Sequence, residues 1–391
     1  MLKRKFLDRL FCTLCISLTF VPISFVFFML FGVVSNAYYS LQQTKVTISL
    51  SDVNTTKQDS RYQIKKKLIH YIISEANKHN IDLKNDEAMK FFSEYSIQEI
   101  KDAIKADKAK IWITLSGAND MMHKHKKYDN SSTAEILKQF AKLGRLKIFF
   151  NHKIFINRDS RDSTQAGVLG VLLGSFYTIF VALVVSLPIG ILTALCLEEF
   201  VAQSKFTDFF EVSISNLSST PPIIFGVLGL AFYINFLGIT RSSSLVGGLT
   251  LAFMMLPILI LSIRQSIKSV PLQIKQAAFA LGASKMQVIK HHILPLSLPG
   301  IITGTILGIA RILGESAPLL MIGMVAFVSN IPTSLIDPST VFAVQTYIWA
   351  TNPDTAFIEK TSMIILILLL ILLILNSVAH FIKKSFHVEF Y

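Results

Sequence analysis

Two opposite charges lie inside a long apolar stretch of this 391-residue chain. In ARILGESAPLL (310–320), Arg311 and Glu315 are four residues apart, which predicts that they share one helical face and can pair. Each charge costs about 2.5–3.5 kcal/mol at the centre of a bilayer, so such residues face a helix bundle or an aqueous path. A guanidinium can bind an oxyanion through two parallel hydrogen bonds. The pair is therefore a candidate site on a substrate path, and a structural ion pair between helices is the alternative.

A helix start is predicted inside another apolar segment, at SSTPP (218–222). Thr220 followed by Pro221 is typical of an N-cap and the first helical position. A helix N-terminus at membrane depth directs unpaired N–H groups and the positive end of the helix dipole towards an anion. Alternatively, 211–219 is an interfacial helix and the membrane span begins at Pro221.

The sequence lacks the common motifs of covalent chemistry and nucleotide hydrolysis. GxxxxGK[ST], HExxH, GxSxG and GxGxxG are absent, so we expect no ATPase site, no other enzyme activity and no cofactor. His123 and His125 in MMHKHKK form a possible metal pair, but no third ligand is near, and a solvated basic loop is favoured. Cys12 and Cys15 lie in an apolar segment, where small packing residues are favoured over a redox or metal site.

The composition indicates a membrane protein that crosses the bilayer several times. Hydrophobic residues make up 52% of the chain, mean hydropathy is +0.53, and only 16% of residues are charged. The apolar residues concentrate in segments long enough to cross about 30 Å of hydrocarbon as helices. The fold class predicted is all-α in the membrane with six transmembrane helices, at 10–34, 168–197, 212–237, 245–263, 293–328 and 357–382.

The distribution of basic residues predicts the orientation in the membrane. The net charge is +13, but most basic residues outside 37–166 flank the apolar segments, which argues against nucleic-acid binding. By the positive-inside rule, both termini are predicted to be cytoplasmic and 37–166 to be external. A signal peptide cleaved at SNA (35–37) is disfavoured because the apolar stretch is too long. The basic residues used are Lys3, Arg4, Lys5, Arg9, Arg264, Lys268, Lys275, Lys285, Lys290, Lys383 and Lys384.

The external insert is predicted to be a small α+β domain without disulfides, because it contains no cysteine. The helix at 64–79 places Ile64, Leu68, Tyr71, Ile72 and Ala76 near one face. The helix at 96–107 opens with the capping box Ser96…Glu99. Strands are predicted at 110–115, 146–150 and 153–157, the last two as a hairpin around Asn151-His152. The expected domains are 1–36 (cytoplasmic tip and first helix), 37–166 (external insert) and 167–391 (membrane core).

The loop QAAFALGASKMQVIKHHILP (276–295) is the most informative segment between two predicted spans. Gly282 predicts a turn between two short helices, and Met286, Ile289 and Ile293 give the second one an apolar face, ended by Pro295. Such a helix–turn–helix fits a groove on a partner protein. The alternative is a segment lying on anionic lipid headgroups.

This loop resembles the EAA loop of ABC-importer permeases, whose coupling helices dock on the ATP-hydrolysing subunit. Gln276 replaces the glutamate of that pattern, and His292 replaces an apolar residue. The resemblance implies ATPase coupling by the residues that occupy the motif, which are Gln276, Ala277, Ala278, Gly282, Leu294 and Pro295.

The flanking segments LPIGILTALCLEEF (187–200), STPPIIFGVLGLAF (219–232) and ARILGESAPLL resemble the PstA-type permeases of phosphate importers, over about 167–382. The resemblance implies an ABC importer permease fold in a bacterial inner membrane. With phosphate as the substrate, the substrate path predicted from the residues is at Arg311, Glu315, Thr220 and Pro221. The resemblance also implies four partners: a homologous permease subunit, cytoplasmic ATP-binding subunits, an external phosphate-binding protein and the lipid membrane. The alternatives are a permease for another oxyanion, such as sulphate or molybdate, and a membrane-anchored sensor that uses the external domain.

Overall fold

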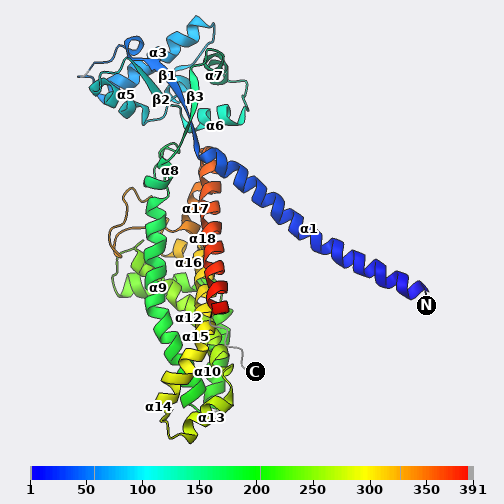
Figure 1. Ribbon diagram of the computed structural model, residues 1–391. Coiled ribbons are helices and arrows are strands. Elements are labelled where there is room, and N and C mark those ends of the chain that lie inside the picture. Colours follow the sequence, from blue (N-terminus) through cyan, green and yellow to red (C-terminus); the bar gives the residue numbers. More distant parts are fainter. Residues whose placement is uncertain (1, 57, 203, 326, 386–391) are drawn as a thin grey trace. The chain divides into compact units, whose positions relative to one another are not determined.

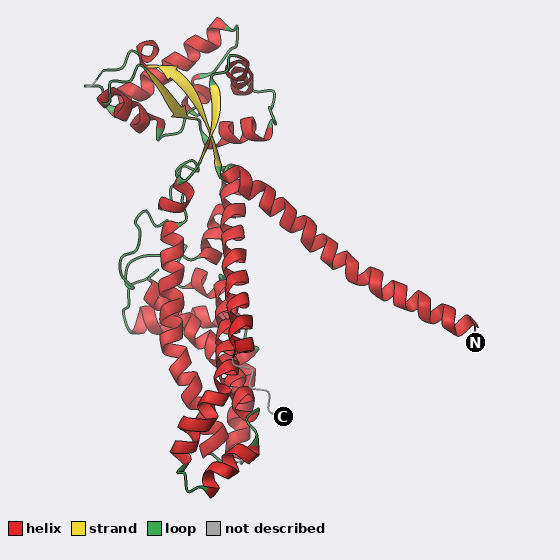
Figure 2. Cartoon of the chain, in the orientation of Figure 1, coloured by secondary structure: helices red, strands yellow, loops and turns green. Residues whose placement is uncertain are grey.

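The chain divides into two compact units in the computed structural model, which describes residues 2–56, 58–202, 204–325 and 327–385 (Figures 1 and 2). Unit 1 comprises Met1–Ile154, Arg161–Ala166 and Asn352–Leu366. Unit 2 comprises Phe155–Ser160, Gly167–Thr351 and Ile367–Tyr391.

Unit 1 contains a three-stranded antiparallel sheet in the order β2-β1-β3. The central strand β1 (Gln42–Ser49) pairs with β2 (Lys110–Thr114) and with β3 (Leu146–Phe150). Because successive side chains of a strand point to opposite faces of the sheet, Val46, Ile48 and Ile113 are buried on the same face. The predicted strands at 110–115 and 146–150 are confirmed, whereas β1 was not predicted.

The predicted hairpin around Asn151-His152 is wrong. Residues Lys153–Ile156 form the short helix α8, and β3 pairs with β1 instead. Asn151 holds the end of β3 beside β1, because its backbone N–H donates to Leu41 O (2.7 Å) and its side-chain amide donates to Ser40 O (3.3 Å). The partner of β3 therefore lies about a hundred residues earlier in the chain rather than in the next segment.

Helices surround the sheet in unit 1. The helix predicted at 64–79 is confirmed as α3, and its predicted apolar face is buried in the core of the unit. Its N-cap Ser60 forms a capping box with Gln63. The helices of this part of the chain are α1 (Leu2–Ser40), α2 (Leu50–Val53), α3 (Arg61–Lys78), α4 (Asn85–Met89), α5 (Ser96–Lys105), α6 (Gly117–His125) and α7 (Ser132–Lys142).

The predicted capping box Ser96…Glu99 is wrong. The N-cap of α5 is Tyr95, and the Ser96 hydroxyl donates to Ser93 O at 2.5 Å. The Glu99 carboxylate instead accepts from Lys45 Nζ (2.7 Å) and from the backbone N–H of Thr114 (2.7 Å). A charged partner makes the stronger hydrogen bond, so the carboxylate joins α5 to the sheet rather than capping its own helix.

The segment MMHKHKK is not a solvated basic loop, because residues 123–125 form the last turn of α6. The His123 ring lies 2.9 Å from the Tyr128 hydroxyl, and His125 Nε2 lies 2.9 Å from Glu359 Oε1. Lys124 is buried, and its Nζ bonds to Asp120 (2.9 Å) and Glu359 (2.6 Å). Burial lowers the pKa of Lys124, but the two carboxylates outweigh it and leave that pKa raised. Within the described residues, no group of three or more His, Cys, Asp or Glu side chains could hold a metal ion.

A second buried lysine lines a water-sized cavity of about 10 Å³ beside this cluster. Lys360 is 5% exposed, and its Nζ has no hydrogen-bond partner among the described residues. Ser40 Oγ and Asn151 Oδ1 line the same cavity and are also without partners there. The cavity therefore contains one fully compensated ammonium, that of Lys124, and one uncompensated ammonium, that of Lys360.

Unit 2 is helical and contains most of the candidate membrane spans. α12 lies at the centre of the bundle and packs against α9 and α15. Small residues allow close approach: a Cβ on Gly248 of α12 would lie 2.5 Å from Val181 Cβ of α9. The helices are α9 (Leu169–Leu195), α10 (Lys205–Ser218), α11 (Pro222–Gly229), α12 (Ser244–Lys268), α13 (Leu272–Ala280), α14 (Lys285–Val288), α15 (Leu294–Leu313), α16 (Ala317–Met321), α17 (Phe342–Ala350) and α18 (Phe357–Ser385, shared with unit 1). Three π-helical turns extend them: η1 (Cys196–Phe200), η2 (Leu230–Phe236) and η3 (Ile289–Ile293).

The described residues contain five helices long and apolar enough to cross a membrane, or six if one bent pair counts as a single span. That pair, Thr207–Ser218 and Pro222–Phe236, is bent by 96°, so the predicted segment 212–237 is not one straight helix. The predicted segment 293–328 is also broken, because α15 ends at Leu313. Pro221 and Pro222 lack backbone N–H donors, which explains the first break.

A buried carboxylate of unit 2, that of Asp159, binds two side chains of α17. Asp159 accepts hydrogen bonds from Gln345 Nε2 and Trp349 Nε1, both at 3.0 Å. Burial raises the pKa of Asp159, although these bonds oppose the rise. Sequence reasoning missed this contact because the partners lie nearly two hundred residues apart.

The two buried lysines of unit 1 predict opposite effects of one substitution. Lys360→Met removes an unpartnered buried ammonium and should raise the free energy of unfolding by about 1–3 kcal/mol. Lys124→Met leaves Asp120 and Glu359 without their cation and should lower it by about 3–5 kcal/mol. Thermal unfolding of the purified protein in mild detergent measures both changes. Destabilisation by both variants would mean that Lys360 also compensates the carboxylates.

Candidate functional site

The first candidate residues lie where α15 ends. Arg311 is exposed in the last turn of α15, Gly314 follows that helix as its C-cap, and Glu315 lies outside it. The prediction that Arg311 and Glu315 share a helical face and pair is wrong, because the helix stops between them. No ion pair of Arg311 is present among the described residues. Glu315 Oε1 instead accepts from the backbone N–H of Ala317 (3.3 Å), at the start of α16.

The second candidate site lies at the bend between α10 and α11. A helix start at this position is confirmed, but it falls one residue later than predicted: Pro221 is the N-cap and Pro222 the first residue of α11. Thr220 is not the N-cap, because its hydroxyl donates back to Asn216 O of α10 at 3.1 Å. The separate helix that precedes the bend agrees with the alternative in which the span begins at the prolines.

The two candidate segments meet through α11 and α16, which pack against each other. A Cβ on Gly226 of α11 would lie 2.6 Å from Pro318 Cα of α16. Only a residue without a side chain allows this distance between the helices. The short helices that follow the two predicted sites, one after Pro221 and one after Glu315, therefore form a single packed element of unit 2.

The loop 276–295 has the predicted helix–turn–helix form. Gly282 has a φ of +81° and separates α13 from α14, and no atom lies within 4 Å of the position of its missing Cβ. Its backbone conformation rather than packing requires glycine. Ser284 and Gln287 form a capping box that starts α14. Gln276 and Ala277 are exposed on α13, whereas Ala278 is buried.

Pro295 does not end the second helix of the loop, contrary to the prediction. The chain stays helical from Lys285 to Leu313, and Pro295 occupies the second position of α15. The π-helical turn η3, which contains the half-buried His292, directly precedes Leu294. A π turn changes the hydrogen-bonding partners locally, so a residue without a backbone N–H fits at the following position.

A charge cluster at the end of α12 was missed by sequence reasoning. Arg264 has a 7% exposed side chain; its Nε donates to Glu198 of η1 at 2.5 Å, and its guanidinium also bonds to Glu211 of α10. Glu198 and Glu211 lie 66 and 53 residues from Arg264 in sequence, so no local pattern indicates the cluster. It joins the last part of α12 to the turn η1 that ends α9 and to the middle of α10.

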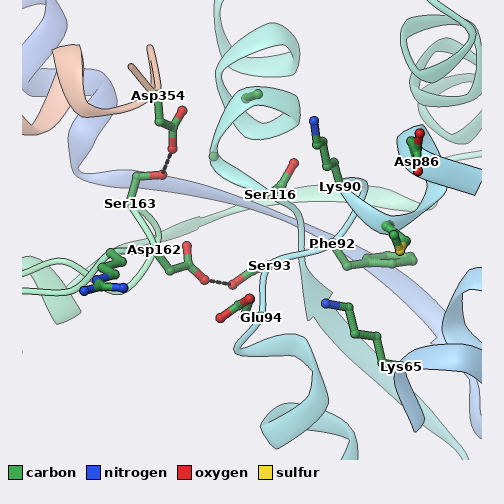
Figure 3. A pocket seen from close by; sticks show the side chains of 14 residues that line it. Lys65, Asp86, Lys90, Phe92, Ser93, Glu94, Ser116, Asp162, Ser163 and Asp354 are labelled. Atoms are coloured by element: carbon green, nitrogen blue, oxygen red, sulfur yellow. Dashed lines mark hydrogen bonds between the residues drawn. The ribbon is translucent and has the colours of Figure 1, made fainter. Parts of the chain in front are cut away.

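Unit 1 has an open cleft of about 840 Å³ with a mixed polar and apolar lining (Figure 3). Two of its carboxylates already have partners: Asp162 accepts from the Ser93 hydroxyl (2.5 Å), and Asp354 accepts from the Ser163 hydroxyl (3.1 Å). The lining carries three basic and four acidic side chains, so charges of both signs are mixed in the cleft and neither sign dominates it. Its charged lining residues are Lys65, Asp86, Lys90, Glu94, Arg161, Asp162 and Asp354.

Residues 186–388 match the family described as binding-protein-dependent transport system inner membrane component. The match covers more than half of the chain, and the chain belongs to this family. It is therefore a multi-pass inner-membrane component of a transport system. Residues 1–133 match a domain of unknown function.

The chain is similar to several named permeases. It is 30% identical over 227 residues to the probable ABC transporter permease protein YqgI of Bacillus subtilis, covering 54% of this chain and 76% of that protein. It is 30% identical over 204 residues to the phosphate transport system permease protein PstA of Haemophilus influenzae, covering 52% and 70%. A PstA homolog of Mycoplasma pneumoniae is 30% identical over 241 residues, which span 59% of this chain and 37% of that protein. Among solved structures, the inward-facing MetNI methionine ABC transporter has 19% identity and a TM-score of 0.44, covering 57% of this chain and 95% of that chain.

The contact between α11 and α16 predicts that Gly226 tolerates no side chain. Gly226→Ala places a Cβ against the backbone of Pro318 and should lower the free energy of unfolding by about 1–3 kcal/mol. Gly170→Ala in α9 is the matched control, because no atom lies within 4 Å of that Cβ position. It should leave stability unchanged or raise it by up to about 1 kcal/mol. Thermal unfolding in detergent compares the two variants, and equal stability would contradict the packing described for Gly226.

Proposed function

We propose that the chain is the permease subunit of an ATP-driven importer that moves inorganic phosphate across the cytoplasmic membrane. The observation that carries this proposal is the similarity of the chain to PstA proteins. The family match over residues 186–388 also contains the helix–turn–helix loop and both helix breaks. In this function the chain binds no ATP, and a partner subunit hydrolyses it.

Arg311 is proposed to contact phosphate on the transport path. It is exposed at the end of α15, and no carboxylate among the described residues neutralises it. A free guanidinium can form two parallel hydrogen bonds with an oxyanion. Glu315 would keep the path near neutral between transport events. The helix start at Thr220 and Pro221 would add the positive end of the α11 dipole.

The loop 276–295 is proposed to dock on the ATP-binding subunit. Gln276 and Ala277 are exposed on α13 and would contact that subunit directly. Gly282 would set the angle between α13 and α14, while Ala278, Leu294 and Pro295 would hold the loop on the bundle. Because glutamine replaces the family's glutamate at 276, this contact would not depend on a carboxylate there.

The proposed function also implies partner subunits and an orientation of the chain in the membrane. The chain would pair with a homologous permease subunit, two cytoplasmic ATP-binding subunits and an external phosphate-binding protein. Both termini would be cytoplasmic, and residues 37–166 would form an external α+β domain inserted between a first region, 1–36, and the permease core, 167–391. The small sheet and the helices of unit 1 support a folded insert.

Uptake measurements test the substrate and the role of Arg311. Loss of the chain should abolish high-affinity uptake of labelled phosphate and leave sulphate and molybdate uptake unchanged. Arg311→Lys keeps the charge but loses one of two parallel hydrogen bonds, so phosphate uptake should fall about tenfold. Arg311→Gln should lower it further. Arg61→Lys, at an exposed arginine of α3, is the control and should transport normally.

The opposite results would reject these assignments separately. Loss of sulphate or molybdate uptake instead of phosphate uptake would assign another oxyanion. Normal phosphate uptake by Arg311→Gln, at a normal protein level, would remove Arg311 from the path without affecting the choice of substrate.

Cysteine labelling tests the orientation. In a background without Cys12, Cys15 and Cys196, an impermeant thiol reagent should label Lys127→Cys in intact cells, because that exposed residue would be external. Lys290→Cys in the loop 276–295 should react with the reagent only after the membrane is opened. The reverse pattern would invert the topology.

A further inference from the structure

Two lysines on either side of the Gly282 turn, Lys275 and Lys285, contact the same short turn of another helix. Lys275 of α13, next to Gln276, places its Nζ 2.5 Å from Glu199 Oε1 in the π-helical turn η1. Lys285, the first residue of α14, places its Nζ 5.0 Å from the centroid of the Phe200 ring, the last residue of η1. A salt bridge and a cation–π contact therefore converge on two adjacent residues from opposite sides of the Gly282 turn.

The turn η1 is the end of a membrane-spanning helix. α9 continues without interruption into η1, so that Leu169–Phe200 is one candidate span. α9 packs along α12, where a Cβ on Gly190 would lie 3.3 Å from Leu259 Cβ. A displacement of η1 is therefore transmitted to the centre of the bundle by a packed helix rather than by a loop.

The ionic contacts of η1 are shielded from solvent, unlike ordinary surface pairs. The side chains of Lys275 and Glu199 are 18% and 12% exposed. Glu198, the neighbour of Glu199, is held by Arg264 at the end of α12. The two adjacent glutamates thus have different partners: one binds the bundle, and the other binds the loop. Partly buried pairs resist screening and couple their helices more strongly than exposed pairs do.

We propose that the Lys275–Glu199 salt bridge, supported by the Lys285–Phe200 contact, passes the movement of the docking loop to α9. Lys275 and Glu199 are positioning residues in this role, because neither contacts phosphate or ATP. The inference rests on the proposed function of the chain as the permease of an ATP-driven importer. It assigns to this chain an internal connection between the loop that meets the ATPase and the helix bundle that opens and closes.

The test separates transport from ATP hydrolysis in the complete complex. The complex, purified with its ATP-binding subunits and placed in vesicles, is assayed for phosphate moved and ATP hydrolysed. Glu199→Gln and Lys275→Gln should each assemble normally and keep their basal ATP hydrolysis. The phosphate moved per ATP should fall about 3- to 10-fold in both, as expected for the loss of a partly buried ion pair.

A charge exchange and a matched control complete the experiment. The double variant Glu199→Lys with Lys275→Glu restores the pair in reverse and should recover most of the coupling. Lys268→Gln is the control, because Lys268 is 53% exposed and lies 3.4 Å from Glu198 outside the loop contact. It should couple normally.

Two results would overturn the proposal. Normal coupling in Glu199→Gln would show that the salt bridge does not transmit movement. Impaired single variants without recovery in the charge exchange would show that the two residues act through other partners. Failure of the wild-type complex to transport phosphate would reject the proposed function instead, so the two failures are distinguishable.

Discussion

The hydrocarbon core of a membrane contains no water, so every backbone polar group there must find its partner within the protein. Both breaks in the helices of unit 2 satisfy this constraint locally. At the first break, the Thr220 hydroxyl bonds back to Asn216 O, and the backbone N–H of Ile224 donates to Pro221 O. At the second, the Glu315 N–H donates to Ile312 O, and its carboxylate accepts from Ala317. These local hydrogen bonds replace part of the helical hydrogen bonding at the two positions.

The charged residues discussed above are of two kinds. Lys124, Arg264 and Lys275 are each held by carboxylates from distant parts of the chain and fix helices to one another. Arg311 has no such partner among the described residues. A compensated charge stabilises an arrangement of helices, whereas an uncompensated and accessible guanidinium is available to a ligand. The distinction depends on geometry and cannot be read from residue type or from local spacing.

Features governed by neighbouring residues were predictable from sequence. The apolar face of α3, the strand β2 and the turn at Gly282 follow from periodicity and from the conformational freedom of glycine. Features that depend on distant partners were not. Glu99 contacts the sheet instead of capping its helix, and His125 meets Glu359 234 residues later. The spacing of Arg311 and Glu315 predicted pairing, but the end of α15 at Leu313 separates them.

Each π-helical turn of unit 2 contains one residue more than the α-helical turn it replaces. A single inserted residue rotates everything after it by about 100° around the helix axis. The turns η1 and η2 end their helices, whereas η3 joins α14 directly to α15. The number of residues in η3 therefore sets the direction in which the faces of α15 point, including the face that ends with Arg311. Loss of one residue from η3 would leave every side chain chemically intact and point Arg311 in another direction.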